Sequence, residues 1–201
     1  MYYFSSDIHF GDEGIIKQDN RPFKNLKDFT NKIIKMWNRQ TTKRDTIFVV
    51  GDFVDCHSQD SYAWQNALLL VKKLKAQVVL ILGNNEERII KYFFDGDFQK
   101  FKEHCLAIGF KDVLKDYTIT MRNTKFYLTH KPLNCKKDCL NLFGHVHAAG
   151  GIYYPFGLNV GCDLHHFKLL GENEIFHFLN KKALFWNDCK HLNMKFNQDL
   201  I

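Results

Sequence analysis

The stretch Thr-Ile-Phe-Val-Val-Gly-Asp-Phe-Val-Asp at residues 46–55 decides the fold. Its apolar run, residues 46–50, is typical of a strand buried on both faces, and Gly51 marks a tight turn directly after it. Buried strands of this kind occur in parallel sheets that are covered by helices. Asp52 therefore follows the carboxyl end of a buried strand, where open α/β sheets place their ligand-binding residues.

The same arrangement, an apolar run followed by a polar side chain, recurs along the chain. The other runs are residues 2–4, 78–82, 126–128 and 140–143, and the polar residues after them are Asp7 with His9, Asn84, His130, and His145 with His147. Strand ends that meet at one crevice bring such residues together. The seven side chains predict a site for two metal ions. Because they include no thiolate, they suit divalent ions such as Mn²⁺, Zn²⁺, Fe or Ni²⁺, and metal-assisted hydrolysis is the expected chemistry.

Helical patterns separate the first strands. The segments predicted to be helical are residues 26–39, 61–74, 86–94, 98–107 and 172–179. The first two are expected to be crossover helices between parallel strands. After residue 113 the pattern changes, because residues 117–121 and 125–128 alternate like strands and the residues between them indicate a hairpin turn.

Five short motifs contain the candidate ligands, and their order resembles that of the calcineurin-like metallophosphoesterases. The motifs are Asp7-Ile8-His9, Gly51-Asp52-Phe53-Val54-Asp55, Gly83-Asn84-Asn85-Glu86, Thr129-His130-Lys131-Pro132 and Gly144-His145-Val146-His147. Five motifs in one order are far more specific than any one of them. The resemblance spans residues 2–163, and residues 7–23 and 159–163 are similar to a small single-domain bacterial and phage-type subgroup.

The resemblance implies a fold, a ligand set and a reaction. The fold would be α/β, a four-layer α/β/β/α sandwich. Asp7, His9 and His147 would bind one metal, Asn84, His130 and His145 would bind the other, and the Asp52 carboxylate would bridge them. The expected reaction is hydrolysis of phosphomonoesters or phosphodiesters through attack by a hydroxide that bridges the two metals, with Mn²⁺ as the expected metal in vitro.

Two positions depart from the family pattern. The family has His at the position of Asn85, near the scissile phosphate, as a proton donor or charge stabiliser. Asn85 can donate a hydrogen bond but not a proton at neutral pH. The leaving group must then be intrinsically good, be protonated by water, or receive a proton from a residue such as His57 or Asp12. Asp12 is the second departure, because the subgroup often has His there.

These observations leave two classes of function open: a phosphoesterase, and a catalytically weakened metal-binding protein that recognises a phosphorylated ligand or partner. The candidate catalytic residues are Asp52, Asp55 and Asn85, and the candidate substrate-binding residues are Arg21, Asn85 and His57. The Arg21 guanidinium can bind phosphate oxygens in a bidentate manner, although Arg21 could instead hold the turn at Pro22. Taken alone, any one Asp could cap a helix, but capping does not explain five motifs together.

Bulk properties fit this reading. The 201 residues predict one domain, residues 1–201, with the motifs within residues 2–163 and a C-terminal helix and tail at 164–201. The net charge of +6 and the pI near 8.9 favour a small phosphate-ester substrate, possibly a nucleotide. Nucleic-acid binding is possible but not favoured, because the lysines are spread along the chain.

Location is predicted from the apolar runs and the cysteines. No apolar run approaches the ~20 residues of a membrane span, and the start of the chain lacks the features of a signal peptide. The six cysteines are scattered and form no Cys-x-x-Cys pair, which favours a reducing compartment. The expectation is therefore a cytoplasmic protein without a membrane partner.

Overall fold

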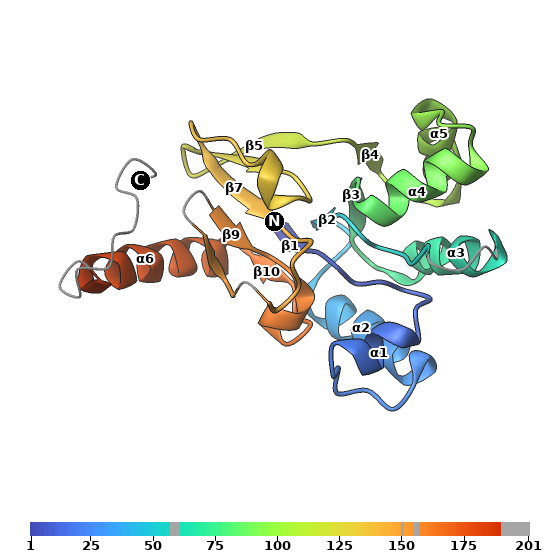
Figure 1. Ribbon diagram of the computed structural model, residues 1–201, viewed down its shortest axis with the longest axis horizontal. Coiled ribbons are helices and arrows are strands. Elements are labelled where there is room, and N and C mark those ends of the chain that lie inside the picture. Colours follow the sequence, from blue (N-terminus) through green and yellow to red (C-terminus); the bar gives the residue numbers. More distant parts are fainter. Residues whose placement is uncertain (57–60, 150, 155–156, 190–201) are drawn as a thin grey trace.

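Two five-stranded sheets form the centre of the structure, a computed structural model that describes residues 1–56, 61–149, 151–154 and 157–189 (Figure 1). The first sheet has the order β10-β1-β2-β3-β4 and consists of β1 (Tyr2–Ser5), β2 (Thr46–Val50), β3 (Gln77–Ile81), β4 (Asp112–Leu114) and β10 (Leu170–Gly171). Strands β1 to β4 are parallel, and β10 is antiparallel to β1. The last strand of the chain thus pairs with the first.

The second sheet has the order β5-β6-β7-β9-β8. Its strands are β5 (Tyr117–Met121), β6 (Thr124–Leu128), β7 (Leu140–Phe143), β8 (Tyr153–Tyr154) and β9 (Gly157–Asn159). Strands β6, β7 and β9 are parallel, whereas β5 and β8 pair antiparallel at the two edges. The predicted hairpin joins β5 to β6 through Arg122 and Asn123, which both have the positive φ that tight two-residue hairpin turns require.

Helices flank the sheets. The α-helices are α1 (Gly14–Gln18), α2 (Leu26–Gln40), α3 (Ser61–Leu68), α4 (Asn84–Phe93), α5 (Phe98–Ile108) and α6 (Glu172–Cys189), and the 3₁₀ turns are η1 (Leu69–Lys73), η2 (Pro132–Asn134) and η3 (Cys162–His165). Helix α2 begins where the Asn25 side chain accepts a hydrogen bond from the Asp28 N–H at 2.9 Å. It buries Phe29, Ile33 and Trp37 at helical spacing against the first sheet.

Alternate side chains of the first sheet enter two different cores. In β2, Ile47 and Val49 pack with the helices, whereas Phe48 and Val50 face the second sheet. Helix α6 runs outward from β10, and its Phe176 ring meets Phe126 of the second sheet at 5.7 Å (Figure 1). Two packed sheets flanked by helices confirm the predicted α/β sandwich.

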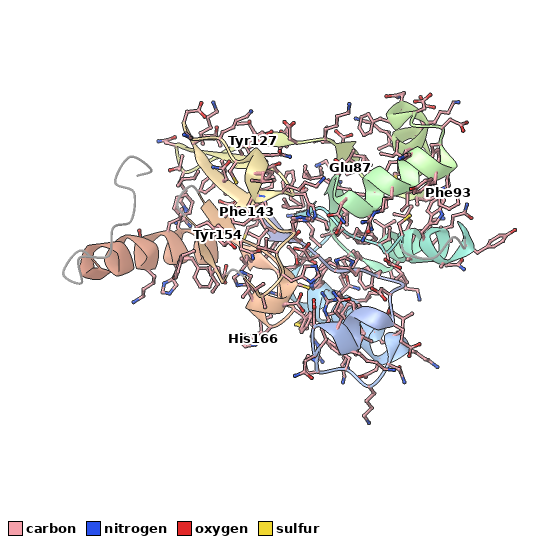
Figure 2. All side chains as sticks on the ribbon, in the orientation of Figure 1. Glu87, Phe93, Tyr127, Phe143, Tyr154 and His166 are labelled. Atoms are coloured by element: carbon pink, nitrogen blue, oxygen red, sulfur yellow. The ribbon has the colours of Figure 1, made fainter. Side chains whose placement is uncertain are left out.

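The outer face of the second sheet is aromatic where β7 passes the β8–β9 hairpin. The rings of Phe143 and Tyr154 lie 4.8 Å apart there, edge to face (Figure 2). Phe143 faces away from the core between the sheets because its neighbour Leu142 faces into that core. The carboxyl end of β7 is therefore held by packing on both faces.

The structure differs from the sequence prediction in its short elements. The segment predicted as one helix at 61–74 is the α-helix α3 followed by the tighter turn η1. Helix α1 and strands β4, β8, β9 and β10 were not predicted. The four strands have only two or three residues, too few to show a two-residue period, and α1, with five residues, is too short to show a helical period.

Candidate metal centre

The seven side chains predicted to bind metals come together in one crevice. They are Asp7 and His9 after β1, Asp52 after β2, Asn84 at the start of α4, His130 after β6, and His145 and His147 after β7. Contacts of 2.9–3.8 Å link all seven into one connected group. The register explains this, because Val50 pairs with Ile81 and Leu128 with Leu142, so the segments that follow start side by side.

Asp7, His9 and His147 form the first part of the site. The Nε2 atoms of His9 and His147 lie 3.2 Å apart, and His147 Nε2 lies 3.8 Å from Asp7 Oδ1. One ligand atom from each residue falls within 4.8 Å of the others. Such a spacing allows one ion to contact all three side chains.

Asn84, His130 and His145 form the second part. The Asn84 Oδ1 atom lies 3.1 Å from His130 Nε2 and 2.9 Å from His145 Nδ1. The other nitrogen of His130, Nδ1, lies 2.9 Å from the Val50 carbonyl oxygen, which accepts the N–H. This bond fixes the tautomer and leaves Nε2 to face the crevice.

Asp52 lies between the two parts. Its Oδ2 atom is 3.7 Å from His9 Nε2 and 3.5 Å from His130 Nε2. Its Oδ1 atom accepts a hydrogen bond from the Asn85 backbone N–H at 3.0 Å, which fixes the carboxylate. One oxygen therefore faces both groups of ligands, as a bridging carboxylate requires.

The backbone turns sharply at five of the seven candidate ligands. Asp7, His9, Asp52, His145 and His147 have φ values of 59°, 56°, 51°, 74° and 47°. This left-handed conformation costs about 1–3 kcal/mol for each non-glycine residue and persists only where the surroundings enforce it. Its concentration at one crevice indicates a functional site.

The Glu86 carboxylate ties the loop after β2 to the start of α4. It accepts hydrogen bonds from the backbone N–H groups of Asp52, Phe53, Val54 and Gly83 at 2.9–3.4 Å. Burial raises the pKa of Glu86 to about 7, and the charge of Asp52 adds to this shift, whereas the backbone N–H groups oppose it. Glu86 thus positions Asp52 and Asn84 without facing the crevice.

The charges in the crevice favour a cation. Burial lowers the pKa of His9 to about 3, so its ring is neutral and keeps a lone pair for a metal. Burial opposes the charge on Asp52, but the hydrogen bond to His130 lowers the pKa of Asp52 to about 2. Burial likewise opposes the charge on His130, but Asp52 raises its pKa to about 9. Asp7 is also fully buried. Divalent ions fit, because they would balance two buried carboxylates and replace the His130 proton.

Asn85, which was predicted to act in catalysis and substrate binding, is buried next to a candidate metal ligand. Its nitrogen lies 3.1 Å from His9 Nδ1, and its oxygen accepts a bond from Arg88 Nη1 at 3.2 Å. These contacts place Asn85 where it can orient the His9 ring.

Arg21 is placed differently from the prediction. Its side chain is fully buried, and it donates to both oxygens of Asp163 at 2.8 Å and to the carbonyl oxygens of Asp7 and Ile8 at 2.8 Å. A guanidinium engaged in this way cannot bind a substrate phosphate. It instead fixes the backbone of the Asp7 loop.

Asp19 is a functional candidate that the sequence analysis missed. Its carboxylate accepts a hydrogen bond from His147 Nδ1, and Asp163 Oδ2 lies 3.8 Å from the same nitrogen. A carboxylate in this position orients a metal-binding histidine and makes its other nitrogen more basic. Asp19 lies in no recognisable motif, so only the three-dimensional structure reveals it.

Two other candidate residues lie at the edge of the first group. Asp12 and Asp55 bring carboxylate oxygens to within 4.8 Å of each other and of a His9 nitrogen. Asp55 is held there by its N–H, which donates to the Phe10 carbonyl at 3.1 Å. The predicted substrate-binding residue His57 lies outside the described residues.

A crevice of oxygen and nitrogen ligands at the ends of two packed sheets is typical of a metal-dependent hydrolase. The chain belongs to the calcineurin-like phosphoesterase family, because the sequence model of that family matches residues 2–188. The resemblance seen in the five motifs is thus confirmed.

Several individual proteins are similar to this chain in sequence or in structure. An uncharacterised protein of Methanocaldococcus jannaschii is 27% identical over 188 residues, which cover 89% of this chain and 91% of the relative. The crystal structure of a protein of unknown function from Aquifex aeolicus has a TM-score of 0.65 and 23% identity, and the match covers 89% of this chain and 98% of that one. The nuclease MPE of Pseudomonas putida has a TM-score of 0.46 and 18% identity, with 73% and 61% covered.

Among the described residues, no helix has both the length and the apolar character needed to cross a membrane.

The first prediction concerns Glu86. Glu86→Gln places an amide N–H₂ group against buried backbone N–H donors, so at least one of these donors loses its acceptor. A buried donor without an acceptor costs about 1–3 kcal/mol, and we expect the free energy of unfolding to fall by that amount. Urea denaturation measures this change. The matched control is Glu87→Gln, because Glu87 is exposed and forms only a surface ion pair. Equal stability of the two variants would contradict the role of Glu86.

The second prediction concerns Asp19. Asp19→Ala removes the acceptor of the His147 Nδ1–H and should weaken metal binding by about 10- to 100-fold at one site while sparing the other. Calorimetric titration with Mn²⁺ resolves the two sites. Asp95→Asn, in the exposed turn after α4, is the control and should bind like the wild type. Unchanged affinity in Asp19→Ala would show that this carboxylate does not support a ligand.

Proposed function

We propose that this chain is a phosphoesterase that uses two divalent metal ions to hydrolyse phosphomonoesters or phosphodiesters. The observation that carries the proposal is the convergence of seven oxygen and nitrogen ligands around Asp52 Oδ2, which faces both groups at 3.5 and 3.7 Å. When bound, two such ions neutralise phosphate charge and lower the pKa of water. Mn²⁺ is the ion we would test first, because carboxylate, amide and imidazole ligands suit it.

Some residues of the site would hold the metal ions, and others orient the residues that hold them. Asp7, His9 and His147 would hold one ion, and Asn84, His130 and His145 the other. Three further residues orient these ligands: Glu86 fixes the Asp52 loop, Asn85 contacts His9, and Asp19 contacts His147. A small phosphate ester, possibly a nucleotide, is the proposed substrate, and the positive net charge of +6 would attract it.

The leaving group of the ester also needs a proton. Asn85 cannot donate a proton and is turned toward His9. Asp12 and Asp55 bring carboxylate oxygens to within 4.8 Å of a His9 nitrogen. The buried Asn85 therefore also supports the second candidate function, a metal-binding protein that recognises a phosphorylated ligand and turns it over poorly.

The test of the bridging role is Asp52→Asn. Neutralising Asp52 weakens both groups of ligands, so we expect the hydrolysis of 4-nitrophenyl phosphate at saturating Mn²⁺ to fall by about 10³-fold. Asn84→Ala, which removes a ligand from one group only, should cost less. Metal content is measured alongside by elemental analysis, with two ions expected in the wild type. Near-normal activity of Asp52→Asn, or a single ion in the wild type, would refute the two-metal proposal.

The chain should discriminate strongly between leaving groups. Without a general acid, which ordinarily contributes about 10² to 10⁴ in rate, esters of acidic phenols should react much faster than alkyl esters. The measurement is the slope of log kcat against leaving-group pKa at saturating metal. A shallow slope means that a residue does donate a proton, and Asp12→Asn and Asp55→Asn would then identify it by steepening the slope.

A further inference from the structure

A cavity of about 660 Å³ is lined by residues that are close in sequence to two ligands of the second group, Asn84 and His130. Thr129, which precedes His130, forms part of its wall, and so do Leu82 and Glu87, which flank Asn84. The walls of the cavity and these ligands thus share the same backbone segments. The volume falls within the roughly 300–1,000 Å³ of sites for small molecules.

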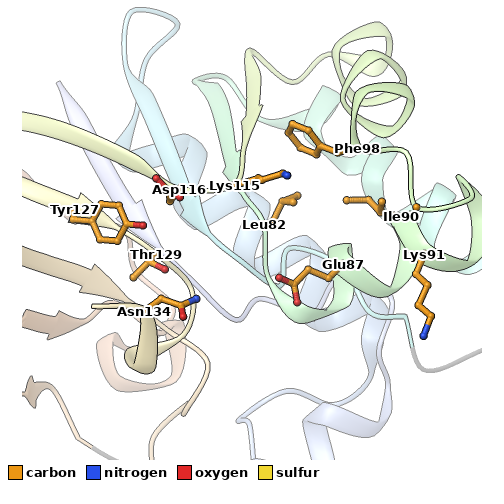
Figure 3. Close-up of a pocket in the computed structure, with 11 residues that line it drawn as sticks. Leu82, Glu87, Ile90, Lys91, Phe98, Lys115, Asp116, Tyr127, Thr129 and Asn134 are labelled. Carbon is orange, nitrogen blue, oxygen red and sulfur yellow. The ribbon is translucent and has the colours of Figure 1, made fainter. Parts of the chain in front are cut away.

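Opposite walls of the cavity come from the two halves of the fold. Figure 3 shows Tyr127, Thr129 and Asn134 on one side, and Leu82, Ile90 and Phe98 on the other. The second wall is apolar and suits a ring or another apolar group. The backbone segments of both walls also carry candidate metal ligands. An ester bound at the metals would therefore extend its organic half between the two walls.

The acidic groups of the cavity already have partners. Glu87 accepts a bond from Lys131 Nζ at 2.9 Å. Asp116 is hydrogen bonded to the Tyr127 hydroxyl, and burial together with this carboxylate raises the pKa of Tyr127 to about 12. The Tyr127 hydroxyl therefore stays protonated at neutral pH.

The two lysines of the cavity are not neutralised. Lys115 and Lys91 form no ion pair with any described carboxylate. Lys115 Nζ lies 5.4 Å from the centre of the Phe98 ring, so it is held over the apolar wall. Lys91 also lines the cavity, but its side chain points away from Lys115 in Figure 3, and its Nζ lies 5.5 Å from the centre of the exposed Tyr92 ring. The Lys115 ammonium group has donors available for an anion.

We propose that this cavity binds the organic half of the phosphate ester and that Lys115 binds a second anionic group on it. The inference rests on the proposed phosphoesterase function. The substrate class is then narrower than phosphate esters in general: an apolar organic group that bears a second phosphate or carboxylate, as in a nucleoside bisphosphate. A second negative charge adds a charge-assisted hydrogen bond that a simple ester lacks.

The test compares two esters with the same reacting bond, the 4-nitrophenyl ester of thymidine 5′-phosphate with and without a 3′-phosphate. In the wild type with Mn²⁺, the 3′-phosphate should raise kcat/KM by about tenfold. Lys115→Ala should remove this advantage, and Lys115→Glu should reverse it. The matched control is Lys100→Ala, because Lys100 is exposed on α5 and does not line the cavity.

Two outcomes overturn the inference: equal kcat/KM for both esters in the wild type, or an advantage that persists in Lys115→Ala. If neither ester is hydrolysed with any divalent metal, the proposed activity on these esters fails, but the cavity is still tested by binding. Calorimetric titration then compares thymidine 3′,5′-bisphosphate with thymidine 5′-phosphate. Tighter binding of the bisphosphate that is lost in Lys115→Ala supports the anion site, and equal binding refutes it.

Discussion

The four backbone N–H groups that bind the Glu86 carboxylate are the constraint on which the centre of this structure depends. Three of these N–H groups belong to the turn after β2 and one to the turn after β3, so one buried carboxylate accepts hydrogen bonds from both turns. It holds the left-handed backbone at Asp52 together with the bonds from the His9 and Asn85 N–H groups. The position of Asp52, and with it the spacing between the two groups of ligands, follows from this bond network.

Two further sets of polar contacts hold the segments that carry the candidate ligands. Arg21 holds the Asp7 loop and Asp163 together, and Asp19 holds His147. Each bond joins segments distant in sequence, so the ligands are fixed before any ion arrives. Such preorganisation lowers the entropy cost of binding a metal ion. The strained backbone carries a free-energy cost, which other interactions in the folded protein must offset.

The sequence predicted that the seven candidate ligands lie in one crevice because their signal is local: an apolar strand followed by a polar residue at a short spacing, in some cases after a glycine. The hairpin at Arg122 and the helix at 26–39 were predicted for the same reason. The buried positions of Arg21 and Asn85 were not predicted, because residue type does not reveal which way a side chain points. Helix α4 begins at Asn84, two residues before the predicted start at residue 86, so Asn85 lies in its first turn. The role of Asp19 and the strand β10 were not predicted, because both depend on contacts between segments more than 100 residues apart.

The pairing of β1 with β10 has a consequence for how the protein is made. Strand β1 and the Asp7 loop are synthesised well before their partners Leu170, Gly161 and Cys162. At roughly 5–20 residues per second, the wait is about 10–30 s. During synthesis the apolar first strand therefore lacks one neighbour, and the crevice cannot close around its ions until nearly the whole described chain has been translated.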